Sequence, residues 1–243
     1  MESYLLTNVG DRDNNEDSAD IISAELGGKS VTICVLADGL GGHGKGEVAS
    51  ALAIQATKNV LEEADSVDGI LEKIIERAQS DILARQKEEH AESAMKTTIV
   101  VLLISDHVAK WAHVGDSRLY MFRNNKYHLR TLDHSIPQML VLSGELKEKK
   151  IRNHPDRNKL LRVLGDEWDR VKYELSEPVD LQAGDAFILC SDGFWENITE
   201  REMCKILRKK KSAQETLELM SGIVQKRGKG KNLDNNTAVL ARI

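Results

Sequence analysis

Several segments of this chain are apolar at almost every position, and this pattern limits the chain to a layered fold. The clearest segment is residues 98–104, where β-branched and leucine side chains follow one another without polar alternation. A strand of this kind must be covered on both faces. Similar β-rich runs occupy residues 31–37, 97–105, 107–114, 117–123, 126–132, 184–191 and 236–242. We therefore expect sheets that are buried on both sides.

Amphipathic helices are predicted in pairs. Apolar residues recur with helical spacing in residues 48–60 and again in residues 67–82. Capping boxes that begin at Thr199 and Ser212 predict a second pair near the C-terminus. Two successive helices between strands argue against a regular βαβ repeat. The economical packing is an α+β fold, a four-layer αββα sandwich of two mainly antiparallel sheets with a helical pair outside each.

The composition favours a single domain, residues 1–243, because no Pro-rich or Ser-rich linker divides the chain. Residues 133–170 are expected to form a flap-like insertion, irregular or helical, that Pro137 and Pro155 break. The net charge of -5 gives no general case for a nucleic acid or a membrane as partner. No disulfides are expected from the odd number of cysteines, and we expect a cytoplasmic location.

Two apolar strands run directly into Asp-Gly, at Asp38-Gly39 and at Asp192-Gly193. A carboxylate at the rim of a buried strand suits a hard cation, and the adjacent glycine lets another backbone approach. Asp-Gly is also a favoured hairpin turn, so each site alone is ambiguous. The other acidic motifs of the chain have to decide between the two interpretations.

The glycine-rich residues 39–46 match two unrelated phosphate-binding patterns, G-x-G-x-x-G and G-x-x-x-x-G-K. A dinucleotide site needs a βαβ unit, whereas the helix predicted after this segment leads into another helix. A P-loop needs a Ser or Thr hydroxyl after Lys45, where this chain has Gly46. A P-loop NTPase is kept as the minor alternative, and a flexible turn into a helix is compatible with any function.

Further clusters with charged or polar groups lie at residues 12–17, 115–118, 132–135 and 234–237. Taken in order with the two Asp-Gly sites, the motifs are R-x-x-N-E-D, D-G-x-G-G, G-D-S-R, D-H-S, H-P, S-D-G and D-N-x-T. Together they resemble the type 2C metal-dependent protein phosphatases, the PPM family, over essentially the whole chain. The segment that follows Asp38 is most similar to the bacterial branch.

The resemblance implies a protein serine/threonine phosphatase, a signalling hydrolase that acts on phosphoserine and phosphothreonine by attack of a metal-bridging water or hydroxide. Its partners would be phosphorylated proteins that a Ser/Thr kinase produces. Hydrolysis of a phosphate monoester dianion needs a nucleophile at neutral pH and positive charge around the phosphoryl oxygens. Two metal ions supply both. Hard oxygen ligands suit Mn²⁺ or Mg²⁺, and the sequence suggests no His/Cys cluster for zinc.

The resemblance also assigns ligands for two ions. Asp38 would bridge them, and the Gly39 carbonyl and Glu16 would attend one of them. Asp192 and Asp234 would hold the other.

The remaining roles are assigned in the same way. Asp17 would act as an outer ligand through water. Arg12 would grip the phosphoryl group, where a planar guanidinium suits bidentate contact. The alternative for Arg12 is a structural ion pair with Glu16 or Asp17. A rival function is a phosphoprotein-binding pseudophosphatase that keeps the fold and turns nothing over.

The chain departs from the family pattern at two places. Animal relatives carry a histidine, a candidate general acid, where this chain has Leu40; His43 and His134 are nearby in the motifs. Bacterial relatives have used a third ion, held by the aspartate that corresponds to Asp116 and by an aspartate where this chain has Glu196. The longer side chain shifts that carboxylate, so a third site is expected to be weak.

Overall fold

A computed structural model describes residues 1–40, 44–91, 94–168 and 173–243. In this part of the chain the strands form two sheets, with the orders β1-β11-β10-β6-β7 and β2-β3-β4-β5-β8, while β9 pairs with β5. All of the pairings between these strands are antiparallel. The strands are β1 (Glu2–Asn8), β2 (Asp17–Leu26), β3 (Lys29–Asp38), β4 (Ile99–Ser105), β5 (Val108–Val114), β6 (Arg118–Arg123), β7 (Lys126–Arg130), β8 (Glu174–Leu175), β9 (Val179–Asp180), β10 (Ala186–Cys190) and β11 (Asn236–Arg242).

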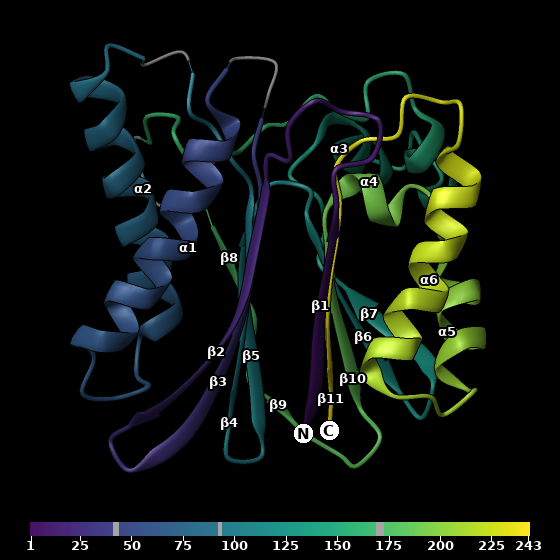
Figure 1. Ribbon diagram of the computed structural model, residues 1–243, viewed down its shortest axis with the longest axis horizontal. Helices are drawn as coiled ribbons and strands as arrows, with labels where there is room; N and C mark the ends of the chain where they lie inside the picture. The colour runs from purple at the N-terminus through teal and green to yellow at the C-terminus, as the bar shows by residue number, and fades with distance from the viewer. Residues whose placement is uncertain (41–43, 92–93, 169–172) are drawn as a thin grey trace.

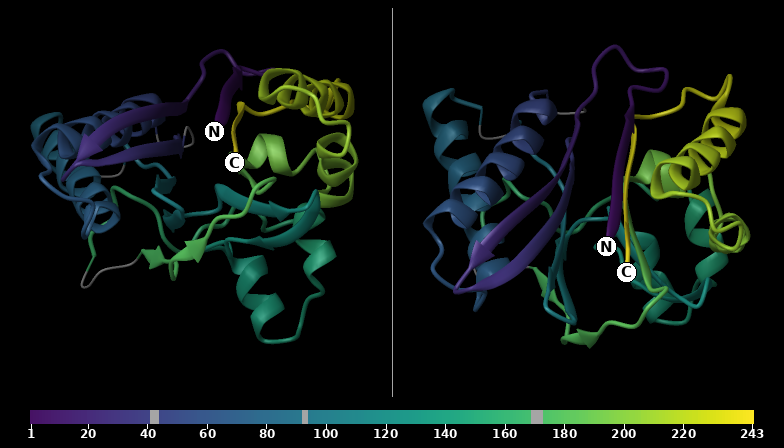
Figure 2. Two further views of the ribbon diagram at one scale, coloured as in Figure 1. Left: turned by 90° about the horizontal axis from the view of Figure 1, so that it is seen from below. Right: turned by 60° about the horizontal axis from the view of Figure 1, so that its bottom comes forward.

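Among the described residues, two pairs of helices cover the outer faces of the two sheets, and two shorter helices lie elsewhere (Figure 1). They are α1 (Gly46–Glu63), α2 (Ile70–Glu88), α3 (Ile136–Leu142), α4 (Asp192–Trp195), α5 (Glu200–Leu207) and α6 (Ala213–Gly228). Figure 1 shows α1 and α2 outside the sheet that contains β2 and β3, with α5 and α6 outside the other sheet. The two further views in Figure 2 keep the same arrangement. The prediction of an α+β four-layer αββα sandwich is confirmed.

The segment that is apolar at almost every position is β4, and both of its faces are buried. Val100 and Leu102 point into the core between the two sheets. Val101 and Leu103 alternate with them and point into the core beneath α1 and α2. Successive side chains of a strand point to opposite faces, so a strand in an inner layer needs apolar residues at every position.

The strands that the sequence did not predict are partly exposed. β2 carries polar side chains and is mostly half-buried, and it lies at the edge of its sheet. β1 lies at the edge of the other sheet, where its pairing with β11 brings the two ends of the chain together. An edge strand with one face toward water lacks the continuous apolar run by which the inner strands are recognised.

Both predicted capping boxes are present. The Thr199 side chain accepts from the backbone N–H of Glu202 at the start of α5, and Ser212 does the same at α6. Pro137 behaves differently from the prediction, because it lies in the first turn of α3 and does not break the segment. Proline is tolerated there since the first N–H groups of a helix have no intrahelical partner. The described part of residues 133–170 is otherwise irregular, with a short 3₁₀ helix at Glu148–Asn153.

The helices of the described residues include none that combines the length and the apolar character of a membrane span. Cys34, Cys190 and Cys204 are buried and free, in agreement with the prediction that they form no disulfides.

The core between the sheets gives a direct test of the layered fold. Phe187 on β10 is fully buried there, with its ring centroid 6.4 Å from that of Trp111. We expect Phe187→Ala to lower the free energy of unfolding by about 3–5 kcal/mol, because it leaves a cavity between two rigid layers. Leu219→Ala, at a position 38% exposed on α6, is the control and should cost far less. Equal losses in urea denaturation would contradict this assignment of the core.

Candidate metal centre

The predicted carboxylates lie near one set of strand ends. Figure 1 shows that the end of β3 and the starts of β2 and β11 lie at the end of the sandwich opposite the chain termini. β3 ends at Asp38, and β2 begins at Asp17, which is directly opposite Asp38 in the strand register. Asp192 begins α4 after β10, and Asp234 comes just before β11. A cleft of about 660 Å³ opens among them. Its lining includes the following predicted site residues: Arg12, Glu16, Asp38, Gly39, Asp116, Asp192 and Asp234.

Asp38 is held through its main chain. Its N–H donates to the Thr98 hydroxyl at 3.1 Å, and its carbonyl accepts from the Thr97 hydroxyl and the Thr98 N–H, both at 2.9 Å. Burial, followed by the charges of Asp17 and Asp192, raises the Asp38 pKa well above its ordinary value of 3.8. The fold therefore places this carboxylate among like charges that repel its ionised form.

The glycines of the two Asp-Gly pairs are required by close backbone packing. A Cβ on Gly39 would lie 2.3 Å from the Gly46 carbonyl oxygen and 2.7 Å from that of Glu16. A Cβ on Gly193 would lie 2.2 Å from the Asn235 carbonyl oxygen. Each glycine thus lets a second segment of the site pack directly against an aspartate's backbone.

Asp17 lies behind the cleft and does not line it. The Ser191 hydroxyl donates to its Oδ2 at 2.8 Å. Its Oδ1 is buried and has no hydrogen-bond partner among the described residues. Burial raises the pKa of Asp17 to about 6, although the hydrogen bond from Ser191 acts in the opposite direction. Such an oxygen fits an outer ligand that holds a cation through a water, because the water would be its hydrogen-bond partner.

Arg12 pairs with a different acid from those expected. Its Nη2 donates to Asp234 Oδ2 at 2.7 Å, and both side chains are partly exposed, at 46% and 38%. The alternative of an ion pair with Glu16 or Asp17 was therefore wrong about the partner. Burial and the charge of Glu47 raise the Glu16 pKa, and Arg12 opposes this rise.

Asp116 and Glu196 stand in different environments. Asp116 is buried at the edge of the cleft, and burial followed by the charge of Asp133 raises its pKa to about 7. Glu196 does not line the cleft. Its Oε1 accepts from Arg157 Nε at 2.5 Å, so this carboxylate already has a cationic partner.

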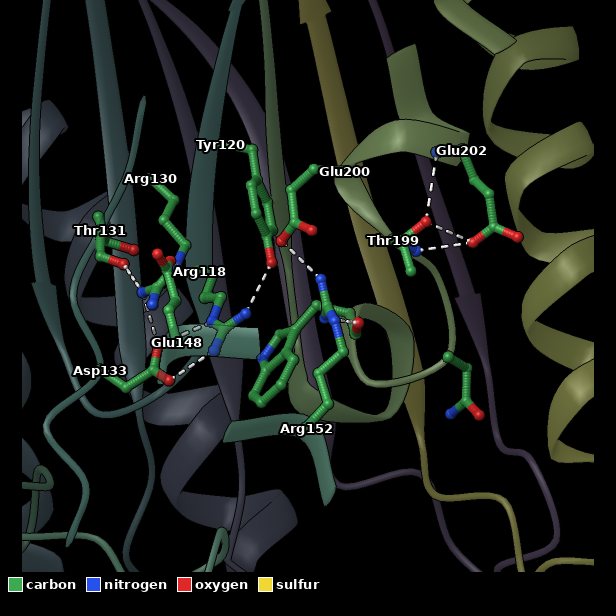
Figure 3. Close-up of polar contacts among 12 residues, drawn as sticks. Arg118, Tyr120, Arg130, Thr131, Asp133, Glu148, Arg152, Thr199, Glu200 and Glu202 are labelled. Carbon is green, nitrogen blue, oxygen red and sulfur yellow. Dashed lines mark hydrogen bonds and ion pairs between the residues drawn. The ribbon is translucent and has the colours of Figure 1, made fainter. Parts of the chain in front are cut away.

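The turn that carries Asp116 is held by a buried ion pair, which Figure 3 shows in part. Arg118 Nε and Nη2 donate to the two oxygens of Asp133 at 2.7 and 2.6 Å, and its Nη1 donates to the Tyr120 hydroxyl at 2.8 Å. The guanidinium lies 3.5 Å from the centroid of the Trp195 ring. The Trp195 indole in turn donates to the Asp116 carbonyl at 3.0 Å.

Of the two candidate general acids, the described residues include His134. His43 lies outside the described residues. His134 is buried and does not line the cleft, whereas Leu40 does. His134 Nδ1 accepts from the Gly115 N–H at 3.1 Å, so this side chain helps to hold the turn before Asp116.

The structure also brings together a group that the sequence did not reveal. Ligand atoms of His113, His134 and Glu174 lie within 4.8 Å of one another. Because His134 Nδ1 accepts a hydrogen bond, its neutral ring carries the proton on Nε2, which faces Glu174 Oε1 at 3.2 Å. A protonated nitrogen does not bind a metal, so these contacts favour hydrogen bonding over a zinc site.

Asn235 was also overlooked as a site residue. It is buried, and its Oδ1 accepts from the Glu16 N–H at 2.8 Å. Its Nδ2 donates to the carbonyls of Val9 and Asn14 at 2.7 and 2.9 Å. This amide therefore holds the loop that carries Arg12 and Glu16. The motif D-N-x-T contained the signal, but its partners lie at the other end of the chain.

The donor chemistry of the cleft fits hard divalent cations. Its candidate ligands include several carboxylates, and burial, followed by the mutual repulsion of these groups, raises the pKa values of Asp38 and Asp192. Divalent ions bound between such groups would replace repulsion with attraction. The unpartnered Oδ1 of Asp17 fits the same interpretation.

Comparison with known proteins identifies similar sequences and structures. A family model described as Protein phosphatase 2C matches residues 9–236. The chain is 32% identical over 215 residues to the serine/threonine phosphatase stp of Listeria monocytogenes serotype 4b, with 86% of this chain and 83% of that protein covered.

Solved structures agree over the full length. Serine/threonine phosphatase Stp1 from Staphylococcus aureus matches with a TM-score of 0.90 and 28% identity, over 100% of this chain and 95% of that chain. The catalytic domain of the serine threonine protein phosphatase PstP, in complex with 2 manganese ions, matches with a TM-score of 0.81 and 27% identity, over 99% of this chain and 97% of that one.

The raised carboxyl pKa values predict how stability depends on pH without metal. Asp17 and Asp116, at about 6 and about 7, bind protons more tightly in the folded protein than in the unfolded chain. Their contribution to stability is complete below about pH 4 and is lost as the pH rises through about 6 to 7. In EDTA, Tm should fall by several degrees between about pH 5 and pH 8, and Mn²⁺ should raise Tm more at the higher pH. A Tm in EDTA that rises over this range would contradict the prediction.

The Asn235 contacts predict a variant that is impaired without loss of any charge. Asn235→Ala removes three hydrogen bonds to residues 9–16 and leaves buried groups unpaired, at about 1–3 kcal/mol each before relaxation. We expect weaker Mn²⁺ binding by calorimetry together with a lower Tm. Gln225→Ala, which loses one side-chain contact to Asn236, is the control and should leave Mn²⁺ affinity unchanged. Equal affinity in both variants would show that Asn235 does not position the loop.

Proposed function

The chain belongs to the protein phosphatase 2C family and is a protein serine/threonine phosphatase, and we propose that its reaction takes place among the carboxylates of the cleft. The observation that carries the proposal is their convergence on one cleft beside a half-exposed guanidinium. Phosphorylated proteins are its substrates, and divalent metal supports the activity, as the family membership implies.

We propose two ions, Mn²⁺ or Mg²⁺, with Asp38 between them. The Gly39 carbonyl and Glu16 would hold one ion, and Asp192 with Asp234 would hold the other. Such ions lower the pKa of water and neutralise charge on a phosphoryl group. The support from this chain is the set of hard oxygen donors in one cleft, where burial and mutual repulsion disfavour the ionised carboxylates and bound cations would stabilise them.

Asp17 would steady the centre from behind. Its Ser191 contact fixes one carboxylate oxygen and leaves the other directed at no protein donor among the described residues. Water between this oxygen and an ion would satisfy both. The elevated pKa of Asp17 would fall once positive charge is present.

Arg12 would bind the phosphoryl oxygens. In this structure it pairs with Asp234, one of the proposed ligands. When Asp234 serves a cation, its lone pairs are engaged, and the guanidinium fork becomes available to an incoming dianion. Arg12 would then exchange its carboxylate partner for a phosphate.

A third ion at Asp116 and Glu196 is a further proposal. Glu196 already accepts from Arg157, which belongs to the segment 133–170. An ion at this position would have to compete with that guanidinium, so we expect weaker binding than at the first two positions.

Three broader points belong to the same proposal. Residues 1–243 would form a single catalytic domain with residues 133–170 as a flap-like insertion, which the pairing of β1 with β11 supports. The substrates would be products of a Ser/Thr kinase. A cytoplasmic location is supported by the buried, free cysteines, since a reducing compartment keeps thiols unpaired.

The proposed chemistry predicts metal-dependent release of phosphate from a phosphothreonine peptide. We expect turnover with Mn²⁺ and none in excess EDTA. Asp38→Asn should reduce kcat by at least about a hundredfold, because it removes the carboxylate proposed to lie between both ions. Arg12→Lys keeps the charge and loses the fork, so it should mainly raise KM. The control is Arg77→Lys, far away on α2. Full activity in EDTA would overturn the proposal.

A further inference from the structure

One wall of the cleft carries an ion pair that the proposed chemistry does not use. Lys96 Nζ lies 2.5 Å from Asp166 Oδ1, and both residues line the cleft. The Lys96 side chain is 20% exposed and that of Asp166 is 44% exposed. Asn158, Leu160 and Val163 continue this wall, so it is formed largely by the segment 133–170.

Two buried glutamines of α2 hold this wall in place. Gln79 accepts from the Gly165 N–H at 2.8 Å and donates to the Asp166 carbonyl at 2.6 Å. Gln86 donates to the carbonyls of Met95 and Gly165 at 3.2 and 2.9 Å. Gln86 thus ties the residue before Lys96 to the residue before Asp166, and Gln79 anchors residues 165–166 to α2. Because both backbones are held, this ion pair has a defined position in the cleft, unlike an ion pair between mobile surface side chains.

The backbone of Lys96 is also joined to the metal-centre side of the cleft. Its carbonyl accepts from the Leu40 N–H at 2.9 Å, two residues after Asp38. The Lys96 backbone is therefore held beside the candidate metal centre, and its long side chain carries the ammonium group from that position. Its three N–H donors allow it to contact a second anion while it stays near Asp166.

Positive charge is scarce in this cleft. Among the described residues that line it, the cationic side chains are Arg12 and Lys96. Arg12 lies on the metal side, where it pairs with Asp234. Lys96 lies on the other wall, which is formed largely by the segment 133–170. Its partner Asp166 is 44% exposed, so the ion pair is open to solvent on that side.

We propose that Lys96 is a specificity-determining residue that binds an acidic side chain next to the phosphorylated residue of the substrate. The carboxylate of the substrate joins or replaces Asp166 as the partner of the ammonium. This inference rests on the proposed function and adds a substrate class to it: phosphoproteins with an acidic residue flanking the phosphorylation site. Lys96 takes no part in the chemical step.

The test uses three phosphothreonine peptides that differ only in having Glu, Gln or Lys on both sides of the phosphothreonine, together with p-nitrophenyl phosphate. The wild-type protein should prefer the Glu peptide to the Gln peptide by about two- to fivefold in kcat/KM, through KM, as for one partly exposed ion pair. Lys96→Ala should remove the preference, and Lys96→Glu should reverse it in favour of the Lys peptide. High salt should weaken the wild-type preference.

A variant that prefers the Glu peptide more strongly than the wild type does would distinguish this role from damage to the fold. Asp166→Asn removes the competing carboxylate, so it should lower KM for the Glu peptide. Lys110→Ala is the matched control, because Lys110 also has one acidic partner, Glu72, and lies outside the cleft lining. It should leave the preference unchanged. None of the variants should alter kcat on p-nitrophenyl phosphate.

The possible failures are distinguishable. An unchanged peptide preference in Lys96→Glu would overturn the inference, and so would an equal loss on p-nitrophenyl phosphate and on all peptides. Wild-type turnover of the Gln peptide with Mn²⁺ tests the proposed function separately. Absence of that turnover would overturn the proposed function, and this inference with it.

Discussion

The structure depends on holding like charges together. Burial and neighbouring carboxylates both disfavour the ionised form of Asp38. Contacts with the surrounding fold must therefore hold this residue in place. The Asp38 main chain is held by hydrogen bonds with Thr97 and Thr98, and by the close packing that Gly39 permits. None of these contacts supplies positive charge, which the proposed divalent ions would supply. The rigidity of the four layers supplies the restraint, because inner strands packed on both faces cannot splay apart.

Buried polar side chains that are not among the proposed metal ligands hold the loops of the site. Asn235 holds residues 9–16, and Gln79 and Gln86 hold the wall beyond α2. His134 holds the Gly115 backbone in the same way. Each of these side chains satisfies main-chain groups that no sheet or helix can satisfy at a loop, which is why an amide or imidazole is found there. The loop of Glu16 and the wall of Asp166 are thus positioned by neutral amides, which add no further repulsion.

Prediction from sequence succeeded where the signal was local and periodic. The continuous apolar run of β4 and the capping boxes at Thr199 and Ser212 each report one element through neighbouring residues, and these elements were found as expected. The edge strands β1 and β2 were missed because half-buried strands have a mixed pattern. Pro137 was misread for a related reason: its effect depends on whether it falls inside a helix or in its first turn. The carboxylates of the cleft were identified from motif order, with Asp17 and Glu196 placed outside its lining only by the structure.

The sequence by itself determined the layered architecture and the kind of donors available, because apolar periodicity and residue chemistry are properties of the chain. Only the tertiary structure decided which charges meet. Arg12 pairs with Asp234 across 222 positions of sequence, Glu196 is engaged by Arg157, and Lys96 reaches Asp166 on the opposite segment of the wall. Partner choice of this kind depends on the placement of loops, and buried amides set that placement through contacts that leave no periodic trace in the sequence.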